Sequence, residues 1–390
     1  MESSSVEFSE VERLRRREFP VCENQVFFAH AAVTALPRAV ARAMADYALE
    51  SSVQQQEFSR VLADIRATRD LAASLIGARW DEIALLGPTS LGLSLFANGV
   101  EWHEGDELVC FGDDYPANVY PWLDLQRRGV CVRRLRAEHP GALTPELVES
   151  ALNERTRMVA LSSCHFFSGY RLDVEAIGAL LRARGILFAL DAIQTLGAFP
   201  LDVVRANVDM LSADAHKWLL GPMAIGIVYV AREHFSTVRP TLLGAWNVHS
   251  PQFLAQEEIE FVPTARRYEP GVLNASGVYG MKAALELLLK EGIESISERI
   301  LSLKALLVKL LVQKGFEVIG PEAGPRSSGI TTVRHPVVPA SVLFKSLEAA
   351  RVVASLRHDR EGKEYLRFSP HFYNTEEEVG RVLEVLSRLI

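Results

Sequence analysis

Cysteine is scarce in this chain, with only four in 390 residues. The four are Cys22, Cys110, Cys131 and Cys164; they show no CxxC spacing, and three lie in apolar, strand-like runs. Zinc sites and disulfide frameworks need paired or clustered cysteines, so the spacing argues against both. We therefore predict buried thiols in a reducing compartment and no metal centre.

Long apolar runs and an excess of positive charge are also missing. No stretch of about 18 apolar residues suggests a membrane span. The start, Met-Glu-Ser-Ser-Ser, lacks the basic and apolar regions of a signal peptide. With 42 Lys and Arg against 49 Asp and Glu, the net charge of -7 argues against a nucleic-acid partner. The basic run at 13–17 lies between Glu12 and Glu18, and we interpret it as the exposed side of a helix. These features predict a cytoplasmic protein with neither a membrane nor a nucleic acid as partner.

Apolar runs alternate with helix-like segments between residues 83 and 230. A chain of this length is expected to form two domains, because single cores rarely exceed about 250–300 residues. Helix starts are indicated at Thr144, which precedes Pro145 and Glu146, and at Asp173. The strand candidates are Ile83–Leu86, Glu107–Phe111, Val130–Leu135, Met158–Ser162, Leu187–Leu190, Met210–Leu211 and Ala224–Val230. This pattern predicts an α/β domain over residues 26–270 with a mostly parallel, seven-stranded sheet covered on both faces, preceded by a helical segment over 1–25.

The pattern changes after about residue 265. Helices are expected after Ser276 and over 293–314, and Thr375 and Glu378 form a capping box before a last helix. Short strand candidates are Phe316–Ile319, Ile330–Arg334, Val352–Leu356 and Tyr365–Ser369. We predict a smaller α+β domain over residues 271–390.

Two strand ends carry a carboxylate and an amine. Asp191 ends the apolar run 185–190, and Lys217 follows His216 close to the next strand candidate. Ligands of parallel sheets bind at the carboxyl ends of the strands. Alone, the lysine is more often a surface residue, and the acid can equally pair with a structural arginine. Together they fit pyridoxal phosphate (PLP), with which a lysine forms a Schiff base while an acid keeps the pyridine nitrogen protonated.

Other polar groups extend this hypothesis to the rest of the cofactor. Thr89 and Ser90 open a helix after a strand, where backbone N–H groups bind phosphate; the alternative is an ordinary N-cap at Ser90. Gln194 can donate to the phenolic oxygen of the cofactor, or simply start a helix. Tyr115 follows the strand 107–111 and either stacks on the ring or packs in the core.

Three residues are candidates for binding the substrate. Arg367, in the strand 365–369, and Arg357, at the end of the previous strand, can clamp a carboxylate or face solvent. His30 follows an apolar run and either faces the substrate or packs in the core.

Together these runs resemble the class V aminotransferase family of fold-type I PLP enzymes. The resemblance extends from about Phe27 to Leu389 in the family's order. It rests on Phe-Phe-Ala-His-Ala-Ala at 27–32, Asp-Ala-x-Gln at 191–194, His-Lys-Trp-Leu at 216–219 and Arg-x-Ser-Pro-His at 367–371. The branches most similar to the chain are the isopenicillin N epimerase-like and cysteine desulfurase-like ones. The resemblance implies an aspartate aminotransferase-like fold, PLP as cofactor, an amino-acid substrate and a homodimer.

The resemblance also implies roles for individual residues. Lys217 would carry the internal aldimine and move the proton at the α-carbon, Asp191 would pair with the pyridine nitrogen, and Arg367 would bind the α-carboxylate. Gln194 would contact the phenolic oxygen and Tyr115 would stack on the ring.

A second set of roles concerns the phosphate. Thr89, Ser90 and His216 would hold it, and the stretch 267–274, which ends at Asn274, matches the segment that reaches the neighbouring subunit's phosphate.

Several positions depart from the family pattern. Desulfurases need a reactive cysteine in the C-terminal domain, and the last cysteine here is Cys164; they also carry a histidine where Tyr115 stands. Asp214 and Val272 replace phosphate-binding serine and threonine, and Ser163 replaces an asparagine. We expect Asp214 to turn away from the phosphate or to bind an arginine.

The favoured hypothesis is an aminotransferase or epimerase that acts at the α-carbon of an amino acid. The alternatives left open are a C–S or C–C lyase of the desulfurase or kynureninase kind, without the catalytic cysteine, and a PLP-binding protein without turnover.

Overall fold

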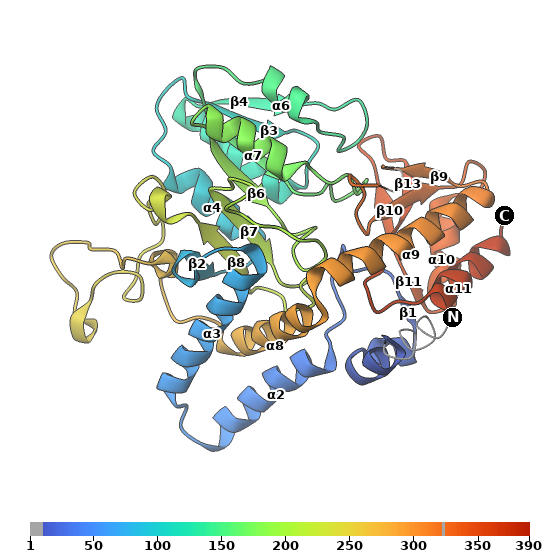
Figure 1. Cartoon of the computed structure of the whole chain (residues 1–390), viewed down its shortest axis with the longest axis horizontal. Helices are drawn as coiled ribbons and strands as arrows, with labels where there is room; N and C mark the ends of the chain where they lie inside the picture. Colours follow the sequence, from blue (N-terminus) through green and yellow to red (C-terminus); the bar gives the residue numbers. More distant parts are fainter. Residues whose placement is uncertain (1–10, 322–323) are drawn as a thin grey trace.

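Seven strands form the central sheet of the larger part of the chain (Figure 1). The structure is a computed structural model that describes residues 11–321 and 324–390. In sheet order the strands are β2 (Ile83–Leu85), β8 (Gly226–Val230), β7 (Met210–Asp214), β6 (Leu187–Asp191), β5 (Thr156–Ser162), β3 (Glu107–Phe111) and β4 (Cys131–Leu135). Strand β8 runs antiparallel to both of its neighbours, β2 and β7, and all other adjacent strands pair in parallel. The predicted mostly parallel α/β sheet is confirmed.

Helices cover both faces of this sheet, which explains why its strands are continuous apolar runs. Side chains alternate between the two cores: Val159 faces the side of α3, α7 and α8, and Met158 faces the side of α4 and α5. The helices are α2 (Arg38–Val53), α3 (Phe58–Ile76), α4 (Thr89–Gly99), α5 (Tyr120–Leu123), α6 (Pro145–Ser150), α7 (Val174–Ala183) and α8 (Ala275–Glu291). Short 3-10 turns are η1 (Pro20–Glu23), η2 (Trp80–Glu82), η3 (Pro116–Asn118), η4 (Asp124–Arg128), η5 (Arg232–His234), η6 (Pro251–Phe253) and η7 (Ala265–Tyr268).

The caps expected from the sequence are present. The side chains of Thr144 and Asp173 accept backbone N–H groups at the starts of α6 and α7, and Thr375 and Glu378 form the capping box of α11 (Glu376–Ser387). Helices α2 and α3 were not expected; they pack against α8. The N-cap alternative for Ser90 is wrong, because α4 already begins at Thr89.

A smaller antiparallel sheet forms the C-terminal part. Its order is β12 (Ser355–His358), β13 (Glu364–Phe368), β10 (Thr331–Arg334) and β9 (Glu317–Ile319), packed with α9 (Ile293–Gln313), α10 (Ala340–Ala349) and α11. A further strand, β11 (Val352–Val353), pairs in parallel with β1 (Val26–Phe27). The start of α9 belongs to the core of the large sheet and its end to that of the small sheet. The boundary at residue 270 stays a prediction.

Two expectations about exposure need correction. Cys110 and Cys164 are buried as expected, but Cys131 is exposed on the edge strand β4 and Cys22 is only partly buried. Residues 11–18 are helical, yet Arg15 bonds to Glu378 at 2.7 Å and is not simply exposed. The first ten residues of the predicted segment 1–25 lie outside the described residues. No helix within 11–321 and 324–390 is long and apolar enough to cross a membrane.

Candidate active site

A cavity of about 470 Å³ opens at the carboxyl ends of β6 and β7, beside the hairpin of β12 and β13. The carboxyl ends of parallel strands lie at the same edge of the sheet, so the polar residues that follow them gather there and line the cavity. Nine of the eleven predicted site residues line it: Thr89, Ser90, Tyr115, Asp191, Gln194, His216, Lys217, Arg357 and Arg367. The strand-end pattern therefore predicted that these side chains meet in one cavity; their roles stay a prediction.

Lys217 lies in the turn that follows β7. It is 8% exposed, and its Nζ makes no hydrogen bond or ion pair with any residue in the described part of the chain. The ring centroid of Tyr115 lies 5.5 Å from this atom. Burial lowers the pKa of Lys217 to about 8, Asp191 opposes that shift, and the nearby Arg367 adds to it. A buried amine with a lowered pKa is suited to act as a nucleophile or base.

Asp191 ends β6 and is 3% exposed. Its Oδ1 accepts the backbone N–H of Ile193 at 3.0 Å, and it also borders the cavity. Burial, together with the charge of Asp114, raises the pKa of this carboxyl to about 7. A carboxylate in such a place is stabilised by a cationic donor that enters the cavity, and a protonated pyridine nitrogen is one.

The start of α4 is tied to the end of β7. The hydroxyl of Thr89 accepts the Asp214 N–H at 2.8 Å, and Ser212 donates to the Thr89 carbonyl at 3.1 Å. The Asp214 carboxylate contacts His216 Nδ1 at 2.5 Å through Oδ2, while its buried Oδ1 has no partner among the described residues. The expectation that Asp214 binds an arginine is wrong, because it holds the histidine that borders the cavity.

Two guanidinium groups enter the cavity from the small sheet. Arg367 is 1% exposed and donates from Nη1 to the Phe166 carbonyl at 2.6 Å, whereas its buried Nε and Nη2 have no partner among the described residues. Burial lowers the pKa of Arg367 to about 9. Arg357 is partly buried and makes only a 3.5 Å contact with the Leu356 carbonyl. Such donors fit a carboxylate ligand.

Gln194 has little freedom in its position. Its Oε1 accepts Trp218 Nε1 at 3.0 Å and its Nε2 donates to the Ala31 carbonyl at 3.2 Å, which leaves one N–H for a ligand.

Two predicted residues are not in the cavity. His30 is fully buried, with Nδ1 near the Ser369 carbonyl at 2.9 Å and Nε2 near the Tyr373 hydroxyl at 2.8 Å. Its assignment to the substrate is therefore wrong, and the packing alternative is confirmed. Asn274 caps α8 by accepting the Gly277 N–H at 3.1 Å and does not line the cavity of this chain.

Sequence reasoning missed Phe166 and the stretch 31–33. Phe166 contributes its carbonyl to Arg367 and packs its ring edge-on against Tyr115, 5.4 Å between centroids. Residues 31–33 form one wall of the cavity. The local sequence does not mark either of them as part of a site, because apolar residues such as these are common throughout protein cores.

These groups fit PLP. The cavity offers an amine without a partner, a buried carboxylate, a helix start with hydroxyls, and arginine nitrogens without partners. An aldehyde reacts with such an amine, a protonated pyridine nitrogen donates to such a carboxylate, and a phosphate and a substrate carboxylate accept from such hydroxyl, N–H and guanidinium groups. The lining residues therefore fit the aldehyde, the pyridine nitrogen and the phosphate of the cofactor.

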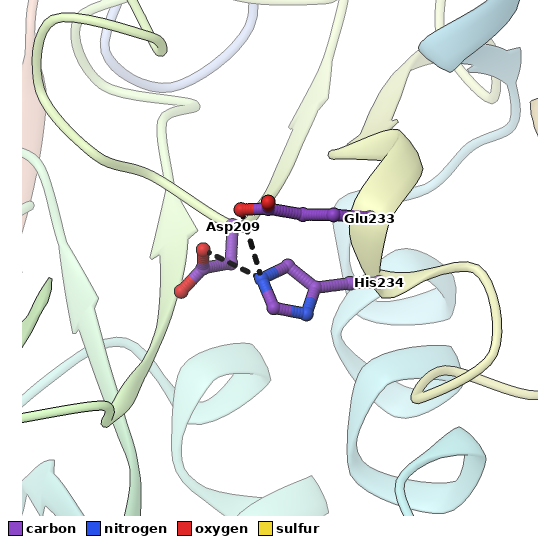
Figure 2. A group of neighbouring side chains, drawn as sticks. All are labelled: Asp209, Glu233 and His234. Carbon is purple, nitrogen blue, oxygen red and sulfur yellow. Dashed lines mark hydrogen bonds and ion pairs between the residues drawn. The ribbon is translucent and has the colours of Figure 1, made fainter.

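A second cluster lies away from the cavity. Asp209, Glu233 and His234 gather at the opposite end of β7, with His234 Nε2 2.9 Å from Asp209 and 3.7 Å from Glu233 (Figure 2). Arg182 already pairs with Glu233 at 2.7 Å, and Asp209 also accepts the Phe188 N–H. These contacts account for the cluster without an ion. The absence of a metal centre stays a prediction.

The sequence is similar to those of curated proteins over almost its whole length. It is 28% identical over 395 residues to a probable cysteine desulfurase of Methanothermobacter thermautotrophicus, covering 96% of this chain and 97% of the relative. It is 27% identical over 372 residues to the uncharacterized aminotransferase YcbU of Bacillus subtilis, covering 95% and 96%.

Solved structures share the fold. An apo cysteine desulfurase from Thermococcus onnurineus has a TM-score of 0.90 at 23% identity, covering 97% of this chain and 98% of that one. The cystine C–S lyase C-DES, in complex with its product cysteine persulfide, has a TM-score of 0.85 at 22% identity, covering 95% and 99%. A variant of C-DES with glycine covalently linked to its PLP cofactor has a TM-score of 0.87 at 21% identity, covering 96% and 98%.

A family model settles the class. The model for aminotransferase class-V matches residues 26–382, which agrees with the sheet, the cavity and the lysine described above. This protein therefore belongs to the class-V aminotransferase family, and its cofactor is PLP.

Proposed function

We propose that the protein is a lyase that cleaves the C–S bond of a cysteine-derived amino acid without using a thiol of its own. The observation that carries the proposal is that Lys217 and Asp191 line one cavity that none of the four cysteines lines. The names of the relatives support sulfur release, and C-DES is named a cystine C–S lyase. Cys164, the last cysteine, is 1% exposed and outside the cavity, so no persulfide on the protein is proposed.

Lys217, Asp191 and Arg367 have the central roles in this proposal. When bound, PLP supplies an aldehyde for the substrate amine and a ring that accepts electrons. Lys217 takes the proton from the α-carbon, and its lowered pKa lets it hold and release a proton near neutral pH. Asp191 keeps a proton at the pyridine nitrogen, and the free Nε and Nη2 of Arg367 bind the α-carboxylate.

The remaining lining residues position the cofactor. Thr89, Ser90 and His216 would hold the phosphate at the start of α4, because the first backbone N–H groups of a helix have no partner within it. Gln194 would donate its remaining N–H to the phenolic oxygen, and Tyr115, whose ring centroid lies 5.5 Å from Lys217 Nζ, would stack on the ring.

The overall reaction balances without a redox partner. A substrate R–S–CH2–CH(NH3+)–COO– loses the α-proton and the thiolate R–S–, which leave together as R–SH. The remaining enamine takes up water and gives pyruvate and ammonium. One thiol, one pyruvate and one ammonium therefore form for each substrate consumed.

Product analysis of the purified holoenzyme tests this reaction. With S-substituted cysteines we expect thiol, pyruvate and ammonium in equal amounts, and no product from Lys217→Ala. The control variant Lys309→Ala changes an exposed lysine of α9 and should retain full turnover. If no thiol is released from any member of the panel, the lyase proposal is wrong.

Transamination is the second candidate, because one relative is named an aminotransferase. It uses the same first proton transfer but requires an added keto acid and releases no thiol. Product that forms only when a keto acid is present would favour it over the lyase. None of the relatives reported above is an isomerase, so epimerisation is not proposed.

We also propose that the protein acts as a homodimer. The support is a group of exposed apolar side chains between residues 242 and 272, a stretch of which part projects from the large sheet domain (yellow in Figure 1): Leu242, Leu243, Phe253, Leu254, Ile259 and Val272. Exposed apolar groups of this kind mark interaction surfaces. Asn274 follows directly and would then lie close to the neighbour's cofactor. A mass of one chain in light scattering would refute the dimer.

A further inference from the structure

Arg357 and Arg367 lie on one face of the hairpin that forms a wall of the cavity. Arg357 stands opposite Tyr365 in the antiparallel register, and Arg367 is two residues further along the same strand. Side chains at such diagonal positions point to the same side, with about 7–8 Å between their backbones. Both guanidinium groups therefore enter the same cavity.

Neither arginine has an acidic partner. No ion pair among residues 11–321 and 324–390 includes Arg357 or Arg367. Burial lowers the pKa of both arginines, and the charge of Arg357 lowers the pKa of Arg367 further. Two like charges at one cavity, one buried and one partly buried, oppose folding when they lack counterions, so an anion that enters the cavity would relieve both.

The hairpin is held in place by contacts outside the cavity. Arg360, in its turn, bonds to Asp113 and donates from Nη2 to the Gly112 carbonyl at 2.6 Å. These partners belong to the loop that carries Tyr115. The two arginines are therefore presented by a fixed element that bridges the two parts of the chain.

The anionic groups described so far do not use both arginines. The proposed phosphate site lies at the start of α4 with His216, and the proposed α-carboxylate site is Arg367. Arg357 remains without an anion. Asp191, the carboxylate of the cavity, faces the pyridine position in the proposed function.

We propose that the substrate carries a second carboxylate, beyond the one on its α-carbon, and that Arg357 binds it. The inference rests on the proposed function only in placing an amino acid in this cavity. It names the substrate class as an amino acid whose side chain ends in an acid, such as an S-carboxyalkyl cysteine or a disulfide of two amino acids. Arg357 is then a residue that determines specificity.

Binding to the holoenzyme, measured by calorimetry, tests the inference without any turnover. Glutarate and valerate are a matched pair of five-carbon acids with two carboxylates and one. We expect glutarate to bind at least about tenfold more tightly, as a hydrogen-bonded charge pair implies. Arg357→Gln should bring the ratio close to one and leave valerate unchanged, while Arg367→Gln should weaken both acids. The control Arg388→Gln alters an exposed arginine at the end of α11 and should change neither.

Two results would overturn the inference. One is equal affinity of the unchanged holoenzyme for the two acids. The other is an equal loss of affinity for glutarate and valerate in Arg357→Gln, which would mean that the two arginines bind a single carboxylate. Arg357→Lys keeps the charge without the planar fork and should retain part of the preference, which guards against a simple folding defect.

Turnover separates this inference from the proposed function. S-carboxymethylcysteine and S-ethylcysteine differ by a carboxylate in place of a methyl group. Lysis of both at equal kcat/KM contradicts the inference and leaves the lyase intact. A preference for glutarate without lysis of either compound contradicts the lyase and leaves the inference intact.

Discussion

Replacing Asp214 with asparagine should weaken cofactor binding through His216. The carboxylate holds His216 Nδ1 at 2.5 Å, and an amide of the same shape keeps the contact but removes the charge. A hydrogen bond to a charged group contributes about 1.5–3 kcal/mol, against about 1 kcal/mol for a neutral pair. The loss of about 1–2 kcal/mol corresponds to an affinity lowered about 5- to 30-fold.

The assay compares the affinity of the apoprotein for pyridoxine 5′-phosphate with its affinity for pyridoxine. Both compounds lack the aldehyde and therefore bind without a covalent bond. Asp214→Asn should weaken the binding of only the phosphorylated compound, because the proposed function places His216 at the phosphate. The unfolding free energy should change by less than about 1 kcal/mol, since the change also removes a buried carboxylate oxygen that has no partner among the described residues.

Asp209→Asn is the matched control. It alters a second buried aspartate–histidine pair, Asp209 with His234 at 2.9 Å, at the other end of the same strand (Figure 2). This variant should bind both compounds as the unchanged protein does. An equal loss of affinity for pyridoxine and for its phosphate in Asp214→Asn would refute the reasoning. Unchanged affinity for both compounds would refute it too.

Three further predictions concern stability. Glu269→Gln should lower the free energy of unfolding, measured in urea, by about 3–5 kcal/mol, because the buried Arg69 loses the carboxylate that now lies 2.5 Å away. The control Asp70→Asn removes the carboxylate of an exposed ion pair with Arg66 and should lower it by less than about 1 kcal/mol. Burial lowers the pKa of His371 from 6.5 to about 4, so the unfolded chain binds a proton first as the pH falls. Stability should drop by about 1.4 kcal/mol per pH unit between pH 6.5 and 4, and His371→Gln should flatten that slope in denaturation curves. Thr375→Ala should cost about 1 kcal/mol in thermal unfolding through the lost cap of α11, and unchanged stability would contradict the role of that cap.

The large sheet could be predicted because its strands are buried on both faces. A run such as Leu187–Asp191 is apolar until the residue that reaches the cavity, and that pattern needs no distant partner to be recognised. Helix α2 gave no such signal: Val40 is its one buried residue, and its N-cap, Pro37, makes no side-chain hydrogen bond. Its position depends on contacts with α8, far away in the sequence.

The same reason separates the predicted residues that line the cavity from His30, which does not. Lys217, Asp191 and Arg367 each stand in a short motif whose polar group follows an apolar run. His30 stands in a similar motif, but Tyr373, which is 343 residues away, engages its ring. A hydrogen bond of that span leaves no trace in the local sequence.

The pairing of β1 with β11 has a consequence for how the protein is made. The Phe28 N–H donates to the Val353 carbonyl, the Ser369 N–H donates to the Phe28 carbonyl, and the Thr34 N–H donates to the carbonyl of His216. The wall at residues 31–33 is thus anchored between the turn that carries Lys217 and strands translated more than 300 residues later. A ribosome must release nearly the whole polypeptide before this pocket closes, so nascent chains stay inactive and dependent on protection until synthesis ends.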